Sequence, residues 1–143
     1  MNNFAIMRHA ATNSDEEIAP ESLDILTRVA RVLAEKIRAT DTYGVHIFHS
    51  PLKRAEVTAH ALAEELSNNG VNDAFVSALS WLGCELYAIH GGSIADAAVS
   101  DEFTVFVTHR PDMISYLEGI AYDGDLRVTN CAVYSPEFVI NGH

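Results

Sequence analysis

Three short apolar runs in this chain each end at basic or imidazole side chains. Phe4–Met7 is followed directly by Arg8 and His9, and the runs Val45–Phe48 and Phe103–Val107 are also followed by histidines and arginines. Apolar runs of this length predict buried strands. A chain that alternates such strands with helices is expected to be an α/β protein, a three-layer sandwich whose mainly parallel central sheet has helices on both faces.

The polar residues that follow these runs would meet if the three strands are parallel. The second run leads to Arg54, and the third leads to His109. Ligands of α/β proteins bind at the carboxyl edge of the sheet. We therefore expect Arg8, His9, Arg54 and His109 to line one pocket. Two guanidinium groups and two imidazoles in one place predict a site for a phosphoryl group.

Helices are predicted between the strands. Apolar residues recur at helical spacing over residues 22–39, and a second helix is expected to begin near Pro51 and to end at 68–70. The other elements expected are a short strand near 74–76, an irregular stretch over 79–100, a helix from Pro111 and a last strand over 132–134.

Length and composition are typical of one globular domain. The 143 residues, 48% of them apolar, predict a single domain over residues 1–143. No apolar run approaches the roughly 18 residues that span a membrane, and the residues before His9 do not resemble a secretory signal. Cys84 and Cys131 lack CxxC spacing, so we expect reduced thiols and a cytoplasmic protein.

The formal net charge of −11 argues against nucleic acids and anionic membranes as partners. An acidic protein also repels phosphorylated ligands at long range. Salt screens that repulsion beyond about 8–10 Å, so a local cluster of arginines can still dominate inside a pocket. The partner expected from the site is a phosphorylated small molecule or a phosphorylated protein.

The motifs resemble those of the histidine phosphatase superfamily. They are Met7–Ala10, Ser50–Ala59 and Val107–His109, in this order along the chain. That superfamily includes cofactor-dependent phosphoglycerate mutases, acid phosphatases and phosphohistidine phosphatases. The resemblance extends over nearly the whole chain and implies a phosphoglycerate-mutase-like fold.

The resemblance implies a role for each motif residue. His9 would be the nucleophile that attacks phosphorus and forms a phosphohistidine. Arg8 and Arg54 would clamp the equatorial phosphoryl oxygens, and His109 would donate to the same oxygens. Thr12 matches a hydroxyl residue often found near the phosphate. No metal or other cofactor is required, because two arginines and a cationic imidazole supply the charge that magnesium supplies elsewhere.

Two positions depart from the family pattern. Ala10 stands where a glycine usually follows Arg-His, and a Cβ would cost about 1 kcal/mol if the backbone there needs a positive φ. Asp15 stands where the mutases carry asparagine, and a carboxylate pointing inward would repel a phosphate. The first departure favours a weakened or inactive relative, and the second argues against a sugar-phosphate mutase.

The interval between Arg54 and His109 is short for this family. It leaves no room for the large helical insertion that forms the specificity walls of mutases and phytases. The resemblance is therefore to the compact phosphohistidine phosphatases of the SixA type, to which residues 109–117 are also similar. A shallow and open pocket is expected.

The general acid is the site residue for which the sequence matches the family pattern least closely. Members that cleave esters have a carboxylic acid after the third strand, which protonates the leaving oxygen. Glu85 is the nearest candidate, and the alternative is a solvated surface glutamate. A chain without a well-placed acid should prefer phosphohistidine or aryl phosphates, because their leaving groups depend less on that proton.

Two functions from different classes remain open. The first is a phosphatase that acts through phosphorylated His9 on phosphohistidine or a small phosphomonoester. The second is a catalytically silent domain that uses the same pocket to recognise a phosphorylated partner. The presence of His9 favours the enzyme, because binding alone needs no nucleophile.

Overall fold

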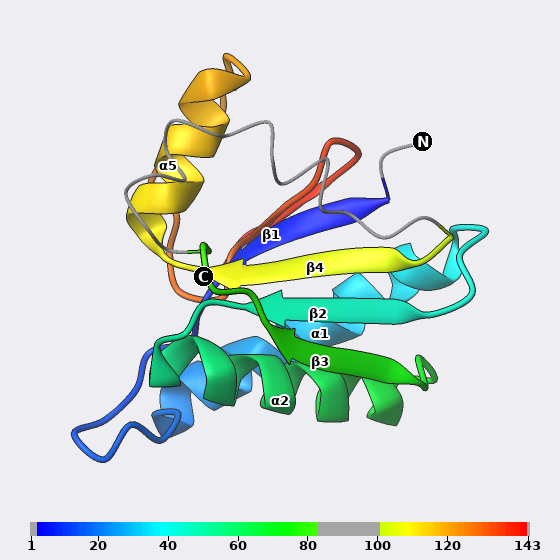
Figure 1. Ribbon diagram of the computed structural model, residues 1–143, viewed down its shortest axis with the longest axis horizontal. Helices are drawn as coiled ribbons and strands as arrows, with labels where there is room; N and C mark the ends of the chain where they lie inside the picture. The colour runs from blue at the N-terminus through cyan, green and yellow to red at the C-terminus, as the bar shows by residue number, and fades with distance from the viewer. Residues whose placement is uncertain (1–2, 83–100, 143) are drawn as a thin grey trace.

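The computed structural model describes residues 3–82 and 101–142. Strands and helices alternate through most of this range (Figure 1). In chain order the elements are β1 (Phe4–Arg8), α1 (Pro20–Arg38), β2 (Val45–His49), α2 (Lys53–Asn68), β3 (Ala74–Ala78), β4 (Phe103–Thr108), α5 (Arg110–Gly119), β5 (Val133–Tyr134) and β6 (Val139–Ile140).

The strands form one sheet in the order β3-β2-β4-β1-β5-β6. β3, β2, β4 and β1 are parallel, whereas β5 and β6 are antiparallel to their neighbours. The predicted α/β class and mainly parallel sheet are therefore confirmed. Because β2 and β1 flank β4, the chain segments that follow these three strands emerge side by side at one edge.

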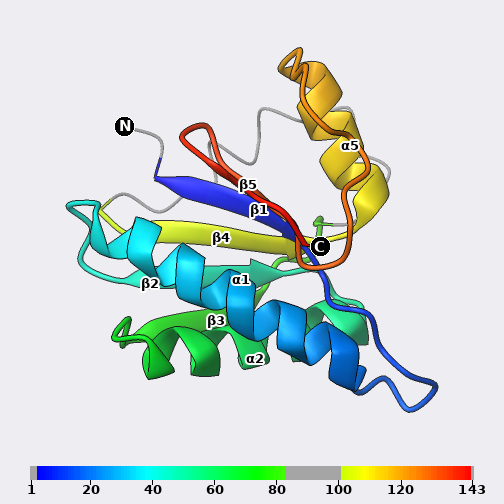
Figure 2. The same cartoon turned by 180° about the vertical axis from the view of Figure 1, so that it is seen from behind.

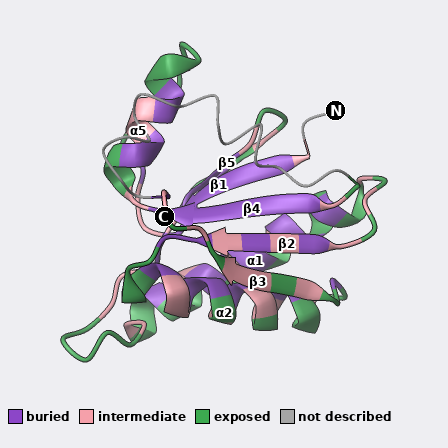
Figure 3. Ribbon diagram, in the orientation of Figure 1, coloured by how far each residue is buried: buried purple, intermediate pink, exposed green. Residues whose placement is uncertain are grey.

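Alternation along β1 divides the core into two layers. Ala5 and Met7 pack with α1 and α2 on one face of the sheet, and Phe4 and Ile6 pack with α5 on the other. Figure 2 shows α1 and α2 lying next to each other across their face. Every residue of β4 is buried, because both of its faces are covered (Figure 3). The three predicted layers are present.

The helix boundaries follow the local backbone. α1 begins at Pro20, two residues before the predicted start, because proline is tolerated in a first turn where its missing N–H has no partner to lose. α2 begins at Lys53 rather than near Pro51, since Leu52 still has an extended ψ of 140°. The expected strand over 132–134 is β5, and β6 is an addition that sequence periodicity did not indicate.

Most of the irregular stretch predicted over 79–100 lies outside the described residues, as do Cys84 and Glu85. Cys131 is a buried free thiol, and burial raises its pKa to about 11. In the part of the chain that the structure describes, no helix combines the length and the apolar character needed to traverse a bilayer.

Candidate active site

The four predicted pocket residues meet at the carboxyl edge of the sheet. Arg8 is the last residue of β1 and His9 follows it, His109 follows β4, and Arg54 lies in the first turn of α2. They share a cavity of about 430 Å³. Among the described residues, the lining consists of Arg8, His9, Leu52, Arg54, His109, Arg110, Pro111 and Asp112.

The His9 ring is held in one tautomer. Its Nδ1 lies 2.8 Å from the carbonyl oxygen of Ala10, and the residue is only 9% exposed. A carbonyl oxygen can only accept, so Nδ1 carries the proton and donates it. The neutral ring therefore has its lone pair on Nε2, the ring nitrogen left to bind or attack a ligand in the cavity.

The pKa of His9 lies below its ordinary value. Burial lowers it most, the hydrogen bond to Ala10 raises it, and the positive charges of Arg8 and Arg54 lower it further. A lowered pKa keeps the imidazole neutral near pH 7. Neutral imidazole is the nucleophilic form, so these surroundings suit a histidine that attacks an electrophile.

His109 stands beside His9, with 5.1 Å between the ring centroids. Its Nε2 lies 2.7 Å from Ser50 Oγ. Burial first, and then His9, Arg54 and Arg8, lower the pKa of His109 to about 4. Both lowered pKa values favour neutral imidazoles at pH 7, which differs from the cationic imidazole that the resemblance led us to expect. Burial and neighbouring cations both disfavour a second buried charge, so the arginines carry the positive charge of the site.

Arg8 is fixed by a distant segment of the chain. Its Nη1 donates to the carbonyl oxygen of Val128 at 2.9 Å, whereas its buried Nε has no hydrogen-bond partner in the described structure. Burial, Arg110 and Arg54 lower the pKa of Arg8, in that order. A buried donor without a partner costs about 1–3 kcal/mol, more when charged, so an anion next to this guanidinium would be strongly stabilised.

The segment over 128–132 holds the backbone around Arg8 as well. Cys131 N–H donates to the Arg8 carbonyl, and Arg8 N–H donates to the Ala132 carbonyl, both at 3.1 Å. Asn130 Nδ2 donates to the His9 carbonyl at 3.0 Å. Val128 and Cys131 have φ values of 48° and 66°, in the left-handed region that side chains disfavour. Sequence reasoning missed this segment, and no motif marks it.

Thr58 links α2 to the segment after β1 by two hydrogen bonds. Its hydroxyl donates to the Arg54 carbonyl at 2.7 Å and accepts from Ala10 N–H at 2.9 Å. Thr58 belongs to the second motif, although we assigned it no role from sequence. The Arg54 guanidinium itself is exposed and makes no hydrogen bond or ion pair within residues 3–82 and 101–142, so it is available to a ligand.

The two departures from the family pattern have local explanations. Ala10 does not have a positive φ, so its Cβ carries none of the strain that was considered. Asp15 is exposed in the loop after β1, where its N–H donates to Asn13 Oδ1, and it does not line the cavity. Neither departure therefore disturbs the arrangement of Arg8 and His9.

The remaining predicted residues lie elsewhere. Thr12 pairs with Ile18 in an isolated bridge of the loop after β1 and is not part of the cavity lining. Glu85 is outside the described residues. Among those that are described, no group of three or more histidine, cysteine, aspartate or glutamate side chains could hold a metal ion.

Two charged residues in the lining were given no role by sequence reasoning. Arg110 begins α5, and its Nε donates to the Arg127 carbonyl at 2.9 Å. Asp112 is 7% exposed and accepts from Thr108 Oγ1 at 2.8 Å. Burial raises the pKa of Asp112. Both could have been predicted from their position just after His109, because side chains in the first turn of a helix that begins there lie near the same edge of the sheet.

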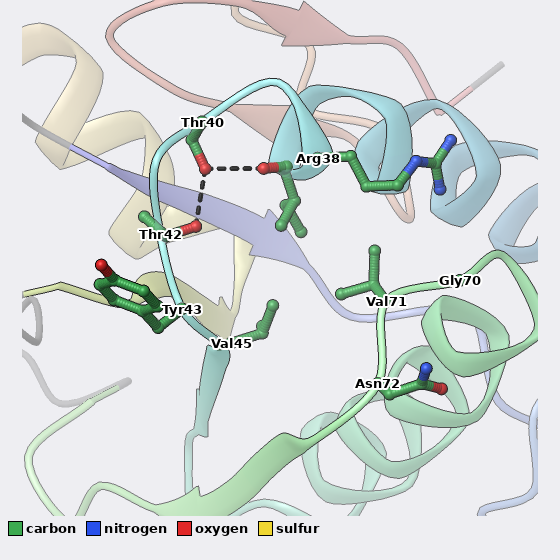
Figure 4. A pocket seen from close by; sticks show the side chains of 10 residues that line it. Arg38, Thr40, Thr42, Tyr43, Val45, Gly70, Val71 and Asn72 are labelled. Atoms are coloured by element: carbon green, nitrogen blue, oxygen red, sulfur yellow. Dashed lines mark hydrogen bonds between the residues drawn. The ribbon is translucent and has the colours of Figure 1, made fainter.

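A second depression, of about 180 Å³, lies at the opposite edge of the sheet (Figure 4). Thr40 Oγ1 donates to the Ile37 carbonyl and lies 2.6 Å from Thr42 Oγ1. Arg38 donates to the Asn69 carbonyl. The polar groups there are largely paired with one another.

Comparison with known proteins identifies the fold. No protein-family model matches the chain, and no curated protein matches its sequence. Among solved structures, one similar protein is assigned as the phosphohistidine phosphatase SixA of Agrobacterium tumefaciens, with a TM-score of 0.63 and 17% identity over 91% of this chain and 87% of that one. Another is phosphoglycerate mutase from Plasmodium falciparum, with a TM-score of 0.60 and 14% identity over 96% and 87% of the two chains.

A third similar structure is assigned as the SixA phosphohistidine phosphatase of Nakamurella multipartitia. Its TM-score is 0.52 and its identity 18%, over 95% of this chain and 85% of that one. The three similarities agree with the resemblance noted in the motifs, at the level of the fold. The chain therefore has the phosphoglycerate-mutase-like fold that these phosphohistidine phosphatases and this mutase share.

Proposed function

We propose that this protein is a phosphatase that hydrolyses its substrate through a phosphohistidine intermediate on His9. The observation that carries the proposal is the state of His9 in the cavity. Its Nδ1 is committed to the Ala10 carbonyl, which leaves the Nε2 lone pair beside the guanidinium groups of Arg8 and Arg54. A neutral nucleophile among cations suits attack on an anionic phosphoryl group.

The reaction has two steps. In the first, the Nε2 lone pair forms a bond to phosphorus while the bond from phosphorus to the leaving atom breaks, and the leaving atom keeps that electron pair and takes up a proton from solvent, which regains one from the attacking water in the second step. In the second, water attacks the phosphohistidine, so that inorganic phosphate leaves and the lone pair returns to Nε2. Arg8 and Arg54 stabilise the phosphoryl oxygens in both steps. Their charge makes a metal unnecessary in this mechanism.

The proposed substrate class is phosphohistidine, with aryl phosphates as good artificial substrates. An imidazole or a phenolate is a better leaving group than an alkoxide and depends less on a general acid. Glu85 stays a predicted acid on sequence grounds alone. The alternative function, a silent phosphate-binding domain, would keep the affinity of the cavity for oxyanions without turnover.

The test compares kcat/KM for a phosphohistidine peptide, p-nitrophenyl phosphate and 3-phosphoglycerate in one buffer. We expect the first two to be hydrolysed and the glycerate to be a poor substrate. On the aryl phosphate, Glu85→Gln should change kcat/KM by less than about tenfold, or 1.4 kcal/mol. Efficient turnover of the glycerate with a large loss in Glu85→Gln would indicate an acid-assisted esterase or mutase. Vanadate binding without hydrolysis of any substrate would indicate the silent domain.

A further inference from the structure

The cavity contains a third arginine that the proposed mechanism does not use. Arg110 follows His109 directly and shares the cavity with Arg8 and Arg54. Its Nε donates to the Arg127 carbonyl, and no other hydrogen bond or ion pair engages it in the described part of the chain. Guanidinium has five N–H donors, so four of them, on the two Nη atoms, are left for a ligand.

The carbonyl that orients Arg110 is itself held in place. The guanidinium of Arg127 binds the Asp125 carboxylate through Nη2 at 2.7 Å and through Nε at 2.9 Å. The backbone N–H of Arg127 donates to the same carboxylate at 2.8 Å. This closed turn fixes the Arg127 carbonyl, so one end of the Arg110 guanidinium has a defined position at the rim of the cavity.

The described lining of the cavity has more cationic than anionic side chains. Arg8, Arg54 and Arg110 face one carboxyl group, Asp112, and both imidazoles are neutral. The Asp112 carboxyl group accepts from Thr108 and forms no ion pair with these arginines in the described structure, so a phosphoryl group held between Arg8 and Arg54 leaves Arg110 without an anionic partner. Arg110 also lowers the pKa of Arg8 more than Arg54 does. Like charges at such close range favour a ligand that also places an anionic group next to Arg110.

We propose that Arg110 binds a second anionic group of the substrate, a carboxylate or another phosphate a few bonds from the phosphoryl group that is transferred. This inference rests on the proposed function, because the phosphoryl group must first lie between Arg8, His9 and Arg54. It makes Arg110 a residue that sets specificity, and within the proposed class it favours phosphohistidine substrates with an acidic group near the phosphoryl group. 3-Phosphoglycerate has such a group, but it stays a poor substrate because its alkoxide leaving group needs a general acid.

The test uses two stable phosphonates that differ by one anionic group, methylphosphonate and methylenediphosphonate. Calorimetric Kd values are measured for the wild-type protein, Arg110→Gln and Arg31→Gln. Arg31 is an exposed residue of α1 outside the cavity, so its variant loses the same charge at a different place. The quantity compared is the ratio of the two Kd values in each protein.

We expect the wild-type protein and Arg31→Gln to bind methylenediphosphonate at least about tenfold more tightly than methylphosphonate, or 1.4 kcal/mol. In Arg110→Gln that preference should fall below about threefold. An unchanged preference in Arg110→Gln, or no preference in the wild-type protein, would overturn this inference and leave the proposed phosphatase intact. Failure of the wild-type protein to bind either phosphonate would overturn the proposed function itself.

Discussion

The two edges of the central sheet differ in how their polar groups are satisfied. At the amino edge, the depression in Figure 4 contains Thr40 and Thr42, which bond to each other, and Arg38, which donates to the Asn69 carbonyl. At the carboxyl edge, Arg54 has no such partner among the described residues, and Arg8 has a buried Nε without one. At the amino edge the polar groups therefore have hydrogen-bond partners within the protein. At the carboxyl edge, guanidinium N–H groups still lack an acceptor among the described residues.

The helices reinforce this difference. α2 and α5 begin at the carboxyl edge, directly after β2 and β4, so the positive ends of their dipoles lie near the cavity. α1 ends near the start of β2, and its last turn is closed by the backbone N–H groups of Ala39 and Thr40, which donate to the carbonyl oxygens of Glu35 and Ile37. Binding of negative ligands is thus favoured at the carboxyl edge. Substitutions at the amino edge of the same molecule can serve as controls for substitutions in the cavity.

The largest effect should come from His9. His9→Ala should lose hydrolysis of an aryl phosphate by more than about a thousandfold, because the covalent step has no substitute. His60→Ala, in an exposed residue of α2 outside the cavity lining, is the matched control and should retain activity. Steady-state kinetics with p-nitrophenyl phosphate measure both. A variant at position 9 that keeps more than about a tenth of the wild-type kcat would contradict the covalent mechanism.

The arginines should come next. Arg8→Lys and Arg54→Lys should each weaken binding of inorganic phosphate by about tenfold or more, since charge-assisted hydrogen bonds contribute about 1.5–3 kcal/mol and lysine lacks the planar pair of donors. Arg38→Lys, at the amino edge, should leave the phosphate Kd unchanged. Calorimetry provides the comparison. Equal losses in all three variants would mean that the loss does not come from the cavity, and no loss in any of them would mean that net charge, which these substitutions keep, determines the affinity.

His109 should make stability depend on pH. Its pKa is about 4 in the folded protein and near 6.5 when unfolded, so the unfolded state takes up the proton first as the pH falls. The His109 contribution to the free energy of unfolding is therefore complete above about pH 6.5 and is lost toward pH 4. His109→Gln should lose less stability over this window in denaturant titrations. Identical losses in both proteins would show that His109 is not held neutral.

The smallest effect should be at the amino edge. Thr42→Val removes the contact with Thr40 and should cost about 0.5–1.5 kcal/mol of the free energy of unfolding. Its kcat/KM on an aryl phosphate should stay within about twofold of the wild-type value. A loss of activity comparable to that of Arg54→Lys would break the separation of the two edges.

Sequence reasoning found the part of the site that short segments encode. Arg8, His9 and His109 could be predicted because each stands at or directly after the end of an apolar strand, and parallel strands bring such positions to one edge. Strand β6 escaped prediction because two residues show no periodicity. The sequence also gave no reason to expect the β-branched Val128 in the left-handed region of φ. Its carbonyl there accepts from the guanidinium of Arg8, 120 positions away in the chain.

The pKa of His109, the backbone angle of Ala10 and the position of Arg110 could not be predicted from the sequence. The lowered pKa of His109 depends on burial and on three charged or titratable neighbours, two of them at the end of β1 and one in α2. The possible strain at Ala10 could be settled only by its backbone angle, which does not lie in the left-handed region. Arg110 was visible in the sequence, but its place in the cavity depends on the Arg127 carbonyl, which belongs to a loop without a motif.

The most direct test of the central claim is to trap the phosphoenzyme. The protein is mixed with an aryl phosphate, quenched rapidly in alkali, under which phosphohistidine survives, and digested for mass spectrometry. We predict a phosphoryl group on Nε2 of His9, because Nδ1 is bound to the Ala10 carbonyl. A phosphoryl group on His109 or another residue, or multiple turnovers with no phosphoenzyme at any quench time, would contradict the account.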